Sequence, residues 1–573
     1  MLQFTAQLVF TILVAQPPNS EFALPGFRKS PWFDELVREQ VVADDVRALA
    51  NAPAAFDPKK PTRLVIYATP NGSTIEQTLG CAAEGLDWHF DIQHVAAQIR
   101  RLREVSPNEN VVLVCLEAEG LSWPAWKRKY TDAPARIHKV IEAVRHWVPG
   151  EKVRLSMTAH SGGGSFLFGL IDGADAIPDF VERIVFLDAN YSYSDIDKHG
   201  DKLLAWLKGD RARRLVAIAY DDRKVTLNNK LVVGPDGGTF RATDRMHARF
   251  ARDAAFSKSS ANDIDTLTAM DGHIALLVHS NPKNIILHTA LVGDMNGLLR
   301  GLTDPDAMPS WGKFGGPRAY SKCVQPAPGI PKRHEDAIGG KEFFNLLDKF
   351  PATEREEAIG REILKGNIPE FLRTFQQVTI RTKDSAGKEH TAVIEVMPDY
   401  LAIGSDKDFV RVPMTPKTAA RIADAFGCSL PTRKVVDEAY RAATVKLEPK
   451  PLTEERELPG TFLRHNSIIE EQFAGKKLGE LVAGIKKDVV VTNRLAEKPN
   501  RVAIYGWHMT DGKAIQPLTI VHVESYIDYS HGVRLMRRIV TVDGKPWDVR
   551  QILYSTNLCE LLSDEGPLTR LTY

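Results

Sequence analysis

One segment, VRLSMTAHSGGGSFLFGLI at residues 153–171, constrains the fold more than any other part of the chain. An apolar-rich run ends at His160, Ser161 follows, and three glycines lead into an apolar stretch of helical length. A sharp strand-to-helix turn needs small residues, because its two arms approach each other closely. The pattern therefore predicts an elbow with Ser161 at its tip. The alternative, a dinucleotide-binding turn, requires a GxGxxG spacing that HSGGGS does not supply.

The chain around this segment alternates short apolar runs with amphipathic stretches between residues 63 and 302. Amphipathic stretches with a helical period separate the runs. Strands are predicted at residues 64–70, 110–118, 153–160, 183–188 and 214–220. This alternation is typical of an α/β fold with a mostly parallel sheet and helices on both faces.

At 573 residues the chain is too long for one ordinary domain. Residues 303–335 are rich in proline and glycine and show no apolar period, which indicates a linker. Residues 336–573 mix helical and strand patterns and predict an α+β domain of unknown role. We therefore expect a first domain over residues 21–302, then the linker, then this second domain.

Residues 1–20 carry an apolar run at positions 2–15 that stops at a QPP sequence. The run is too short to span a bilayer, so no integral membrane segment is expected. It predicts a signal peptide, and hence a secreted or periplasmic protein. The start of the run lacks basic residues. The alternative is therefore a terminal strand or helix packed on the body of a cytoplasmic protein.

Charge and cysteine content narrow the classes of partner. Lys and Arg number 74 against 73 Asp and Glu, a formal charge of +1, which gives no global attraction to nucleic acid. The five cysteines form no CxxC pair, so neither a zinc-ribbon spacing nor a dense disulfide framework is present. The sequence shows no phosphate-binding loop, haem motif or nicotinamide fingerprint, and we predict no cofactor.

The elbow, which reads AHSGG at residues 159–163, resembles the GxSxG nucleophile elbow of the α/β-hydrolase superfamily, with alanine at the first glycine. The resemblance covers about residues 60–302. It implies a serine nucleophile at Ser161, with an acid and a histidine that follow in that order along the chain.

A serine hydroxyl is a weak nucleophile until a histidine takes its proton. His288 ends a predicted apolar strand one short loop before a closing helix, where it is similar to the superfamily's catalytic histidine; His279 is the runner-up. The acid stays open. Asp221 or Asp222 follows the second strand after the elbow, the superfamily's usual position, and Asp188 follows the first, a known variation.

Two kinds of supporting residue are expected around Ser161. The backbone N–H of Gly162, with a helix N-terminus behind it, is placed to stabilise a developing oxyanion. A second donor is expected from the loop after the strand at 64–70, where Asn71 or Gly72 follows directly. A plain Pro-Asn-Gly turn is the alternative there.

Aromatic and polar residues follow two of the predicted strands. Trp88 and His89 lie after the first strand, and Trp123 and Trp126 after the second. Open α/β sheets bind ligands at the carboxyl ends of their strands. We therefore expect these four residues to contact a ring or sugar substrate, with simple anchoring of the loops as the alternative.

The second half holds a separate cluster, His508, His522, Asp528 and His531, within 24 residues. Imidazoles with a carboxylate are the ligands of catalytic zinc, although the spacings match no known motif. A hydrogen-bonded binding groove and a purely structural role are the alternatives. No metal is therefore assigned.

Together these patterns predict an exported serine hydrolase that cleaves a carboxylic ester of a small molecule or polymer, with an amide as a second option. Two rivals are kept. One is a metal-dependent peptidase, and the other a cell-wall or polysaccharide-binding protein, each acting through the C-terminal histidine and aspartate cluster.

Overall fold

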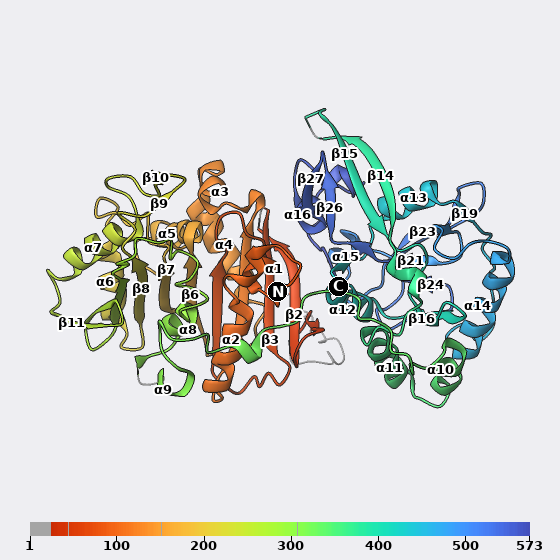
Figure 1. The fold of residues 1–573 in the computed structure, drawn as a ribbon, viewed down its shortest axis with the longest axis horizontal. Helices are drawn as coiled ribbons and strands as arrows, with labels where there is room; N and C mark the ends of the chain where they lie inside the picture. Colours follow the sequence, from red (N-terminus) through yellow and green to blue (C-terminus); the bar gives the residue numbers. More distant parts are fainter. Residues whose placement is uncertain (1–23, 44, 151, 306–307, 385) are drawn as a thin grey trace, which may run out of the picture.

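The computed structural model describes residues 24–573 except residues 44, 151, 306–307 and 385. The chain forms two lobes that lie side by side, the first with one large sheet and the second with several smaller ones (Figure 1). The predicted signal peptide, residues 1–20, lies outside the described residues. Within the described part of the chain, each helix is too short or too polar to cross a membrane.

Among the described residues, eleven strands form the sheet of the N-terminal lobe, in the order β1-β2-β3-β5-β4-β6-β7-β8-β13-β12-β11. The run from β5 to β13 is parallel, and antiparallel strands extend it at both ends. The bounds are β1 Arg28–Lys29, β2 Glu35–Val42, β3 Val46–Pro53, β4 Thr62–Ala68, β5 Asn110–Ala118, β6 Val153–His160, β7 Val181–Leu187, β8 Arg214–Tyr220, β11 Phe256–Ala261, β12 Ile264–Ala269 and β13 Ile274–His279.

Helices cover both faces of this sheet. Side chains of β4 alternate between the faces, with Leu64 and Ile66 in one core and Val65 and Tyr67 in the other. On the first face lie α3 Trp123–Lys129, α4 Ala133–Arg145, α5 Gly164–Asp172, α6 His199–Gly209 and α7 Thr239–Phe250. On the second lie α1 Ile75–Leu79, α2 Val95–Val105 and α8 Gly297–Leu302. The predicted fold class, an α/β-hydrolase-like sheet with helices on both faces, is confirmed.

Some elements differ from the sequence-based expectation. The antiparallel strands β2 and β3 were not predicted, because their buried faces carry Glu35, Glu39 and Arg47, which break the apolar alternation. The stretch 303–335, expected to be a linker, places Trp311 and other aromatic side chains in the same core as α2 and α8. Its first part therefore packs on the N-terminal lobe.

The C-terminal lobe mixes helices with small sheets around a core of its own, which agrees with the predicted α+β class. Its longest sheet runs β18-β25-β15-β26-β27, with β14 paired to β15, and a second sheet runs β23-β22-β21-β24. The strand bounds are β14 Gln376–Lys383, β15 Glu389–Val396, β16 Ala402–Ser405, β17 Asp408–Arg411, β18 Cys428–Ser429, β19 Val445–Lys446, β20 Val482–Ala483, β21 Lys487–Val489, β22 Ile504–His508, β23 Ala514–Thr519, β24 His531–Gly532, β25 Met536–Arg537, β26 Ile539–Val542 and β27 Lys545–Asp548. The helices are α10 Gly340–Leu347, α11 Ala352–Leu364, α12 Pro416–Phe426, α13 Arg433–Ala442, α14 Pro459–Phe473, α15 Arg494–Glu497 and α16 Val549–Tyr554.

Buried and partly buried polar side chains, most of them charged, join the two lobes, and we call them the inter-lobe cluster. Tyr554 Oη donates to Glu117 Oε1 at 2.9 Å, and Arg550 Nη1 lies 2.9 Å from Glu76 Oε1. The members are Glu39, Arg47, Glu76 and Glu117 from the N-terminal lobe and Asp424, Arg538, Arg550 and Tyr554 from the C-terminal lobe. Removing one partner of such a buried pair leaves an uncompensated charge, so these contacts hold the lobes in one arrangement.

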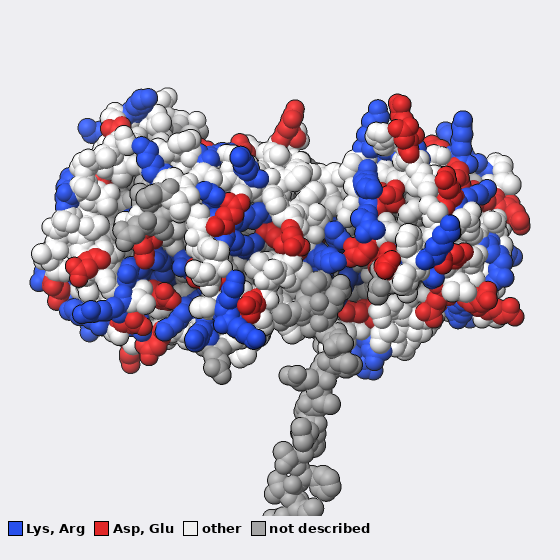
Figure 2. Space-filling view, turned by 90° about the horizontal axis from the view of Figure 1, so that it is seen from below, with Lys and Arg blue, Asp and Glu red and all other residues white. Residues whose placement is uncertain are grey.

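The surface carries both signs of charge. Figure 2 shows Lys and Arg side chains interspersed with Asp and Glu over both lobes on the face it draws. This distribution agrees with the formal charge of +1. On that face no single-sign field extends over a whole lobe to steer a charged partner.

Candidate active site

Ser161 lies at the turn between β6 and α5, as the sequence predicts. Its backbone φ is 54°, in the left-handed region that residues with a side chain rarely adopt. A short 3-10 turn over Ser161–Gly163 connects the strand to the helix. Backbone strain of this kind persists only where the surroundings enforce it, and it is concentrated at functional sites.

The three glycines after Ser161 are required by close backbone approach. A Cβ on Gly162 would collide with the side chain of Asn71, and one on Gly163 with the carbonyl of Ala68 at the end of β4. A Cβ on Gly164 would overlap a carbonyl in the loop after β7. The elbow therefore touches the loops after both neighbouring strands, and no larger side chain fits at these three positions.

His288 is held by one of the three candidate acids. Its Nδ1 lies 2.5 Å from Oδ2 of Asp188, a buried carboxylate directly after β7. The hydroxyl of Thr239, at the start of α7, donates to the other oxygen of Asp188. The contact with Asp188 therefore fixes the orientation of the imidazole through Nδ1.

The other two aspartates have different partners. Asp221 is half-buried and accepts hydrogen bonds from Arg223, whose Nε lies 2.8 Å from Oδ1. Asp222 is buried and accepts from the backbone N–H of Thr239 at 3.0 Å, so it caps α7. Burial and the nearby carboxylate of Asp188 raise the pKa of Asp222 to about 6. Sequence alone could not separate these residues, because two strand ends offer three aspartates at the same edge of the sheet.

The segment of His288 packs against the elbow. The ring centroids of His160 and His288 are 4.5 Å apart, and Nε2–H of His160 donates to the backbone carbonyl of His288 at 3.0 Å. Burial holds the pKa of His160 well below its usual range, so this imidazole is neutral. Among the described residues no hydrogen bond joins Ser161 to His288, and that link belongs to the proposal below.

Two sequence predictions about the His288 segment have different outcomes. The prediction of an apolar strand directly before His288 is wrong. The last strand of the N-terminal sheet, β13, ends at His279, and the described residues 284–287 pair with no strand. The closing helix is present as α8. The side chain of His279 accepts a hydrogen bond from the N–H of Asn281 at 3.0 Å and has no contact with Asp188.

The candidate oxyanion donors lie beside the elbow. The Asn71 side chain rests against Gly162, as the glycine geometry requires. The N–H of Gly72, however, donates to the carbonyl of Leu121 at 2.9 Å. This engagement removes Gly72 from the candidates and leaves Gly162 and Asn71.

The four aromatic and imidazole candidates divide into two groups. Trp88 is 65% exposed, and its ring lies 3.9 Å from that of His89. Trp123 and Trp126 are instead buried in the core on the face of α5, and Trp126 Nε1 donates to Asp45 at 2.5 Å. The predicted substrate contact of these two indoles is therefore not supported, because an amphipathic helix, α3, turns them inward.

Exposed apolar side chains surround the carboxyl edge of the sheet, a feature that the sequence analysis missed. They occur in the loops after β4, β7, β8 and β13, whose parallel strands end at one edge. They are Leu86, Trp88, Tyr191, Ile196, Leu227, Leu231, Val232, Ile285 and Ile286. Tyr191 reaches furthest inward, with Oη 3.5 Å from His288 Nδ1. The sequence signal that could have indicated this surface is the presence of apolar residues between short turns.

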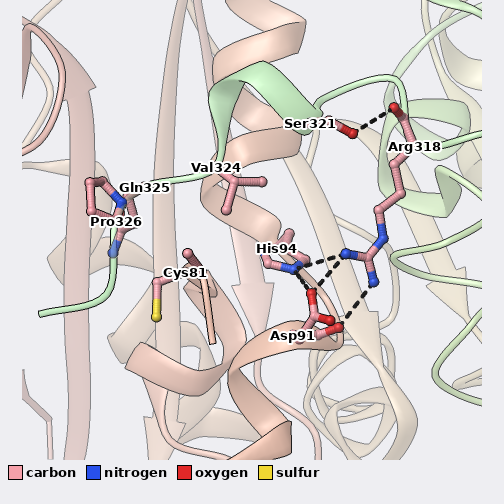
Figure 3. A pocket seen from close by; sticks show the side chains of 9 residues that line it. Cys81, Asp91, His94, Arg318, Ser321, Val324, Gln325 and Pro326 are labelled. Atoms are coloured by element: carbon pink, nitrogen blue, oxygen red, sulfur yellow. Dashed lines mark hydrogen bonds and ion pairs between the residues drawn. The ribbon is translucent and has the colours of Figure 1, made fainter. Parts of the chain in front are cut away.

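A pocket of about 420 Å³ lies between the loop after β4 and residues 318–326 (Figure 3). In it, Asp91 Oδ1 lies 2.6 Å from His94 Nε2 and 2.7 Å from Arg318 Nη1. Burial and the charge of Asp91 raise the pKa of the Cys81 thiol to about 11, so this cysteine stays protonated and is a poor nucleophile. The pocket contains none of the predicted site residues.

The C-terminal histidines and aspartate are only partly brought together. His508 lies 3.0 Å from Asp437 instead, and His522 stacks on a tyrosine. His531 Nε2 and Asp528 Oδ1 are 4.0 Å apart. Among the described residues no group of three or more His, Cys, Asp or Glu side chains has the arrangement of a metal site.

Comparisons with known proteins give likeness in fold only. No family model and no curated protein matches the chain. Similar solved structures include a glucuronoyl esterase from Solibacter usitatus, at 11% identity, covering 52% of this chain and 88% of that one, with a TM-score of 0.30. A dienelactone hydrolase-like promiscuous phosphotriesterase from metagenomic libraries has 12% identity, coverage of 48% and 94%, and a TM-score of 0.26.

A third similar structure is the feruloyl esterase module from Clostridium thermocellum, at 14% identity, with coverage of 33% and 68% and a TM-score of 0.21. Because these TM-scores are low, the class of the N-terminal lobe rests on its own strand order and elbow. These define a mostly parallel α/β sheet with helices on both faces and with Ser161 at the strained turn after β6.

Proposed function

We propose that the N-terminal lobe is a serine hydrolase that cleaves a carboxylic ester through a covalent acyl-enzyme. The observation that carries the proposal is the pair of His288 and Asp188, 2.5 Å apart, packed against an elbow in which Ser161 has a φ of 54°. A strained serine, a buried carboxylate and a histidine, in this chain order, are the parts that acyl transfer requires.

In the proposed reaction, Ser161 Oγ attacks the ester carbonyl carbon while His288 Nε2 takes the hydroxyl proton. Asp188 stabilises the imidazolium through Nδ1–H. The tetrahedral oxyanion accepts hydrogen bonds from the N–H of Gly162 and from Asn71. His288 then protonates the leaving alcohol, and a water molecule, activated by the same imidazole, releases the acid from Ser161.

The exposed apolar side chains around the carboxyl edge favour an ester with an apolar or aromatic group. Apolar surface gathered around a site is favourable for binding such groups, because water is released from both surfaces.

Export through residues 1–20 also remains a proposal. N-terminal sequencing of the protein recovered from its natural host tests it, since a start after residue 15 supports cleavage and an intact Met1 contradicts it.

Hydrolysis of short-chain and aromatic p-nitrophenyl esters tests the activity, together with labelling by a fluorophosphonate. We expect the wild type to be active and labelled, and Ser161→Ala and His288→Ala to be inactive. His279→Ala is the matched control, because this histidine lies on β13 without contact to Asp188. An unlabelled, inactive wild type, or label retained in Ser161→Ala, contradicts the proposal.

A further inference from the structure

A second group of buried polar side chains lies in the C-terminal lobe, around Lys487, the first residue of β21, and Lys486 directly before it. Each member is less than one tenth exposed. We call it the Lys486 cluster. Its members are His465 from α14, Lys486 and Lys487, Trp507 from β22, and Asp528, Tyr529 and His531 at the start of β24.

The amino groups of both lysines of this cluster lack a carboxylate within ion-pair distance among the described residues. Lys486 Nζ donates to the backbone carbonyl of Tyr529, and Lys487 Nζ lies 5.1 Å from the Trp507 ring. In the described part of the chain neither forms an ion pair. Asp528 is the nearby opposite charge, but it acts on the lysines from beyond ion-pair distance, and its oxygens accept from Arg456 at 2.6 Å and from the N–H of Ser530 at 2.8 Å.

Buried nitrogen atoms in the cluster also lack partners. Both ring nitrogens of His531, which is 1% exposed, have no hydrogen bond, and neither has Trp507 Nε1. Buried polar groups are almost always hydrogen-bonded in native proteins, so these nitrogens need a partner from outside the chain, an ordered water or a ligand. Lys487 and His531 are direct partners across β21 and β24, which brings the unpaired charge and the free imidazole together.

The backbone is strained at the same place. Trp507 has a φ of 54°, and the pairing of β22 with β23 shifts register between Ile504 and Gly506. Such irregularities re-aim a side chain and occur next to functional sites. Here the indole lies beside Lys487 and 6.3 Å from the Tyr529 ring, so two aromatic faces border the lysines.

We propose that the Lys486 cluster binds an oxyanion, the carboxylate or phosphate group of a small ligand, between Lys486, Lys487 and His531. Trp507 and Tyr529 form apolar walls for the rest of the ligand. The ligand enters beside Arg456, whose side chain is 39% exposed and contacts the buried Asp528. This site is independent of the ester cleavage proposed for the N-terminal lobe.

The electrostatics of Lys486 agree with this assignment. Burial, and then the nearby charge of Arg411, lower the pKa of Lys486 to about 7. A bound oxyanion would favour the ammonium form and offset both effects, since an opposite charge at close range stabilises a charged group. Arg411 itself is neutralised by Asp399, with Nη2 2.6 Å from Oδ2.

Calorimetric titration of the full-length protein with inorganic phosphate, and separately with acetate, tests the proposal. Lys486→Met removes the charge at nearly constant length and is expected to weaken binding at least tenfold, as loss of a charge-assisted hydrogen bond does. Lys446→Met is the matched control, because this lysine lies 4.7 Å over the Tyr440 ring in the same lobe. It should bind as the wild type does.

Binding of phosphate alone identifies a phosphoryl ligand, and binding of acetate identifies a carboxylate. Absence of binding of both anions to the wild type overturns the proposal, because water then completes the buried contacts. Unchanged affinity in Lys486→Met overturns it too. If Lys486→Met fails to fold, Lys487→Met takes its place. It is expected to weaken binding at least tenfold, and unchanged affinity overturns the proposal.

Discussion

Replacing Glu117 by glutamine tests the inter-lobe cluster through the pH dependence of stability. This carboxyl group, at the end of β5, is fully buried and accepts hydrogen bonds from Tyr554 Oη and from the N–H of Ile75 at 2.7 Å. Burial raises its pKa from 4.5 to about 7, against the opposing charge of Arg47. Glutamine keeps the shape and cannot ionise.

The sign follows from proton binding. Between pH 4.5 and 7 the folded state binds more protons at Glu117 than the unfolded state, so the free energy of unfolding falls as pH rises through this window. Above pH 7 the ionised group destabilises the fold by about 3 kcal/mol, at roughly 1.4 kcal/mol for each unit of raised pKa. Most of this, about 2–3 kcal/mol, develops between about pH 5 and pH 8.

Urea unfolding of the full chain at pH 5 and pH 8 measures the effect. Relative to the wild type, Glu117→Gln should gain about 2–3 kcal/mol in free energy of unfolding on going from the lower to the higher pH. Glu142→Gln, a half-exposed position on α4, is the control and should follow the wild type. A Glu117→Gln variant that keeps the pH dependence of the wild type refutes the reasoning.

Three further predictions concern the N-terminal lobe. Asp188→Asn should lower kcat for p-nitrophenyl esters by about 10⁴-fold, whereas Asp221→Asn keeps wild-type turnover; equal losses in both would show that the acid is misassigned. Gly164→Ala should lower the free energy of unfolding by about 3 kcal/mol, because its Cβ meets the carbonyl of Ala189; an unchanged urea midpoint contradicts this. Trp88→Ala should raise KM for aromatic esters about fivefold, the effect of losing one aromatic contact, and leave KM for acetate esters unchanged. Equal shifts in both series would show that Trp88 does not belong to the binding surface.

The parts of the fold that follow from continuous apolar runs were predictable. Strand β5 has the predicted bounds because every residue in it is buried, so it reads as one unbroken run. Strands β2 and β3 were not, because the partners that help to bury Glu39 and Arg47 include Arg550 and Glu117, which are distant in the chain. A pairing over such a sequence separation leaves no local pattern.

The site shows the same division. The glycine run fixed the elbow locally, since each glycine is required by a neighbouring loop. The choice among three aspartates depended on which side chain reaches His288, and that depends on the left-handed backbone of Asp188 and on the position of α7. Trp123 and Trp126 were misassigned for a related reason, because an aromatic residue after a strand can face the core or the solvent.

The contacts of Glu117 connect the two halves of the chain to the oxyanion side of the candidate site. Glu117 accepts a hydrogen bond from the N–H of Ile75, the first residue of α1. This helix begins directly after the loop that carries Asn71. In the C-terminal lobe, the N–H of Thr556 donates to Glu119 at 2.9 Å. Glu119 lies two residues before Leu121, whose carbonyl accepts from the N–H of Gly72. The loop that carries Asn71 and the segment that accepts from Gly72 are therefore both next to residues held by contacts with the second lobe. Because Glu117 holds both Tyr554 and the start of α1, we expect a change in its charge to shift the loop of Asn71 as well as to alter stability.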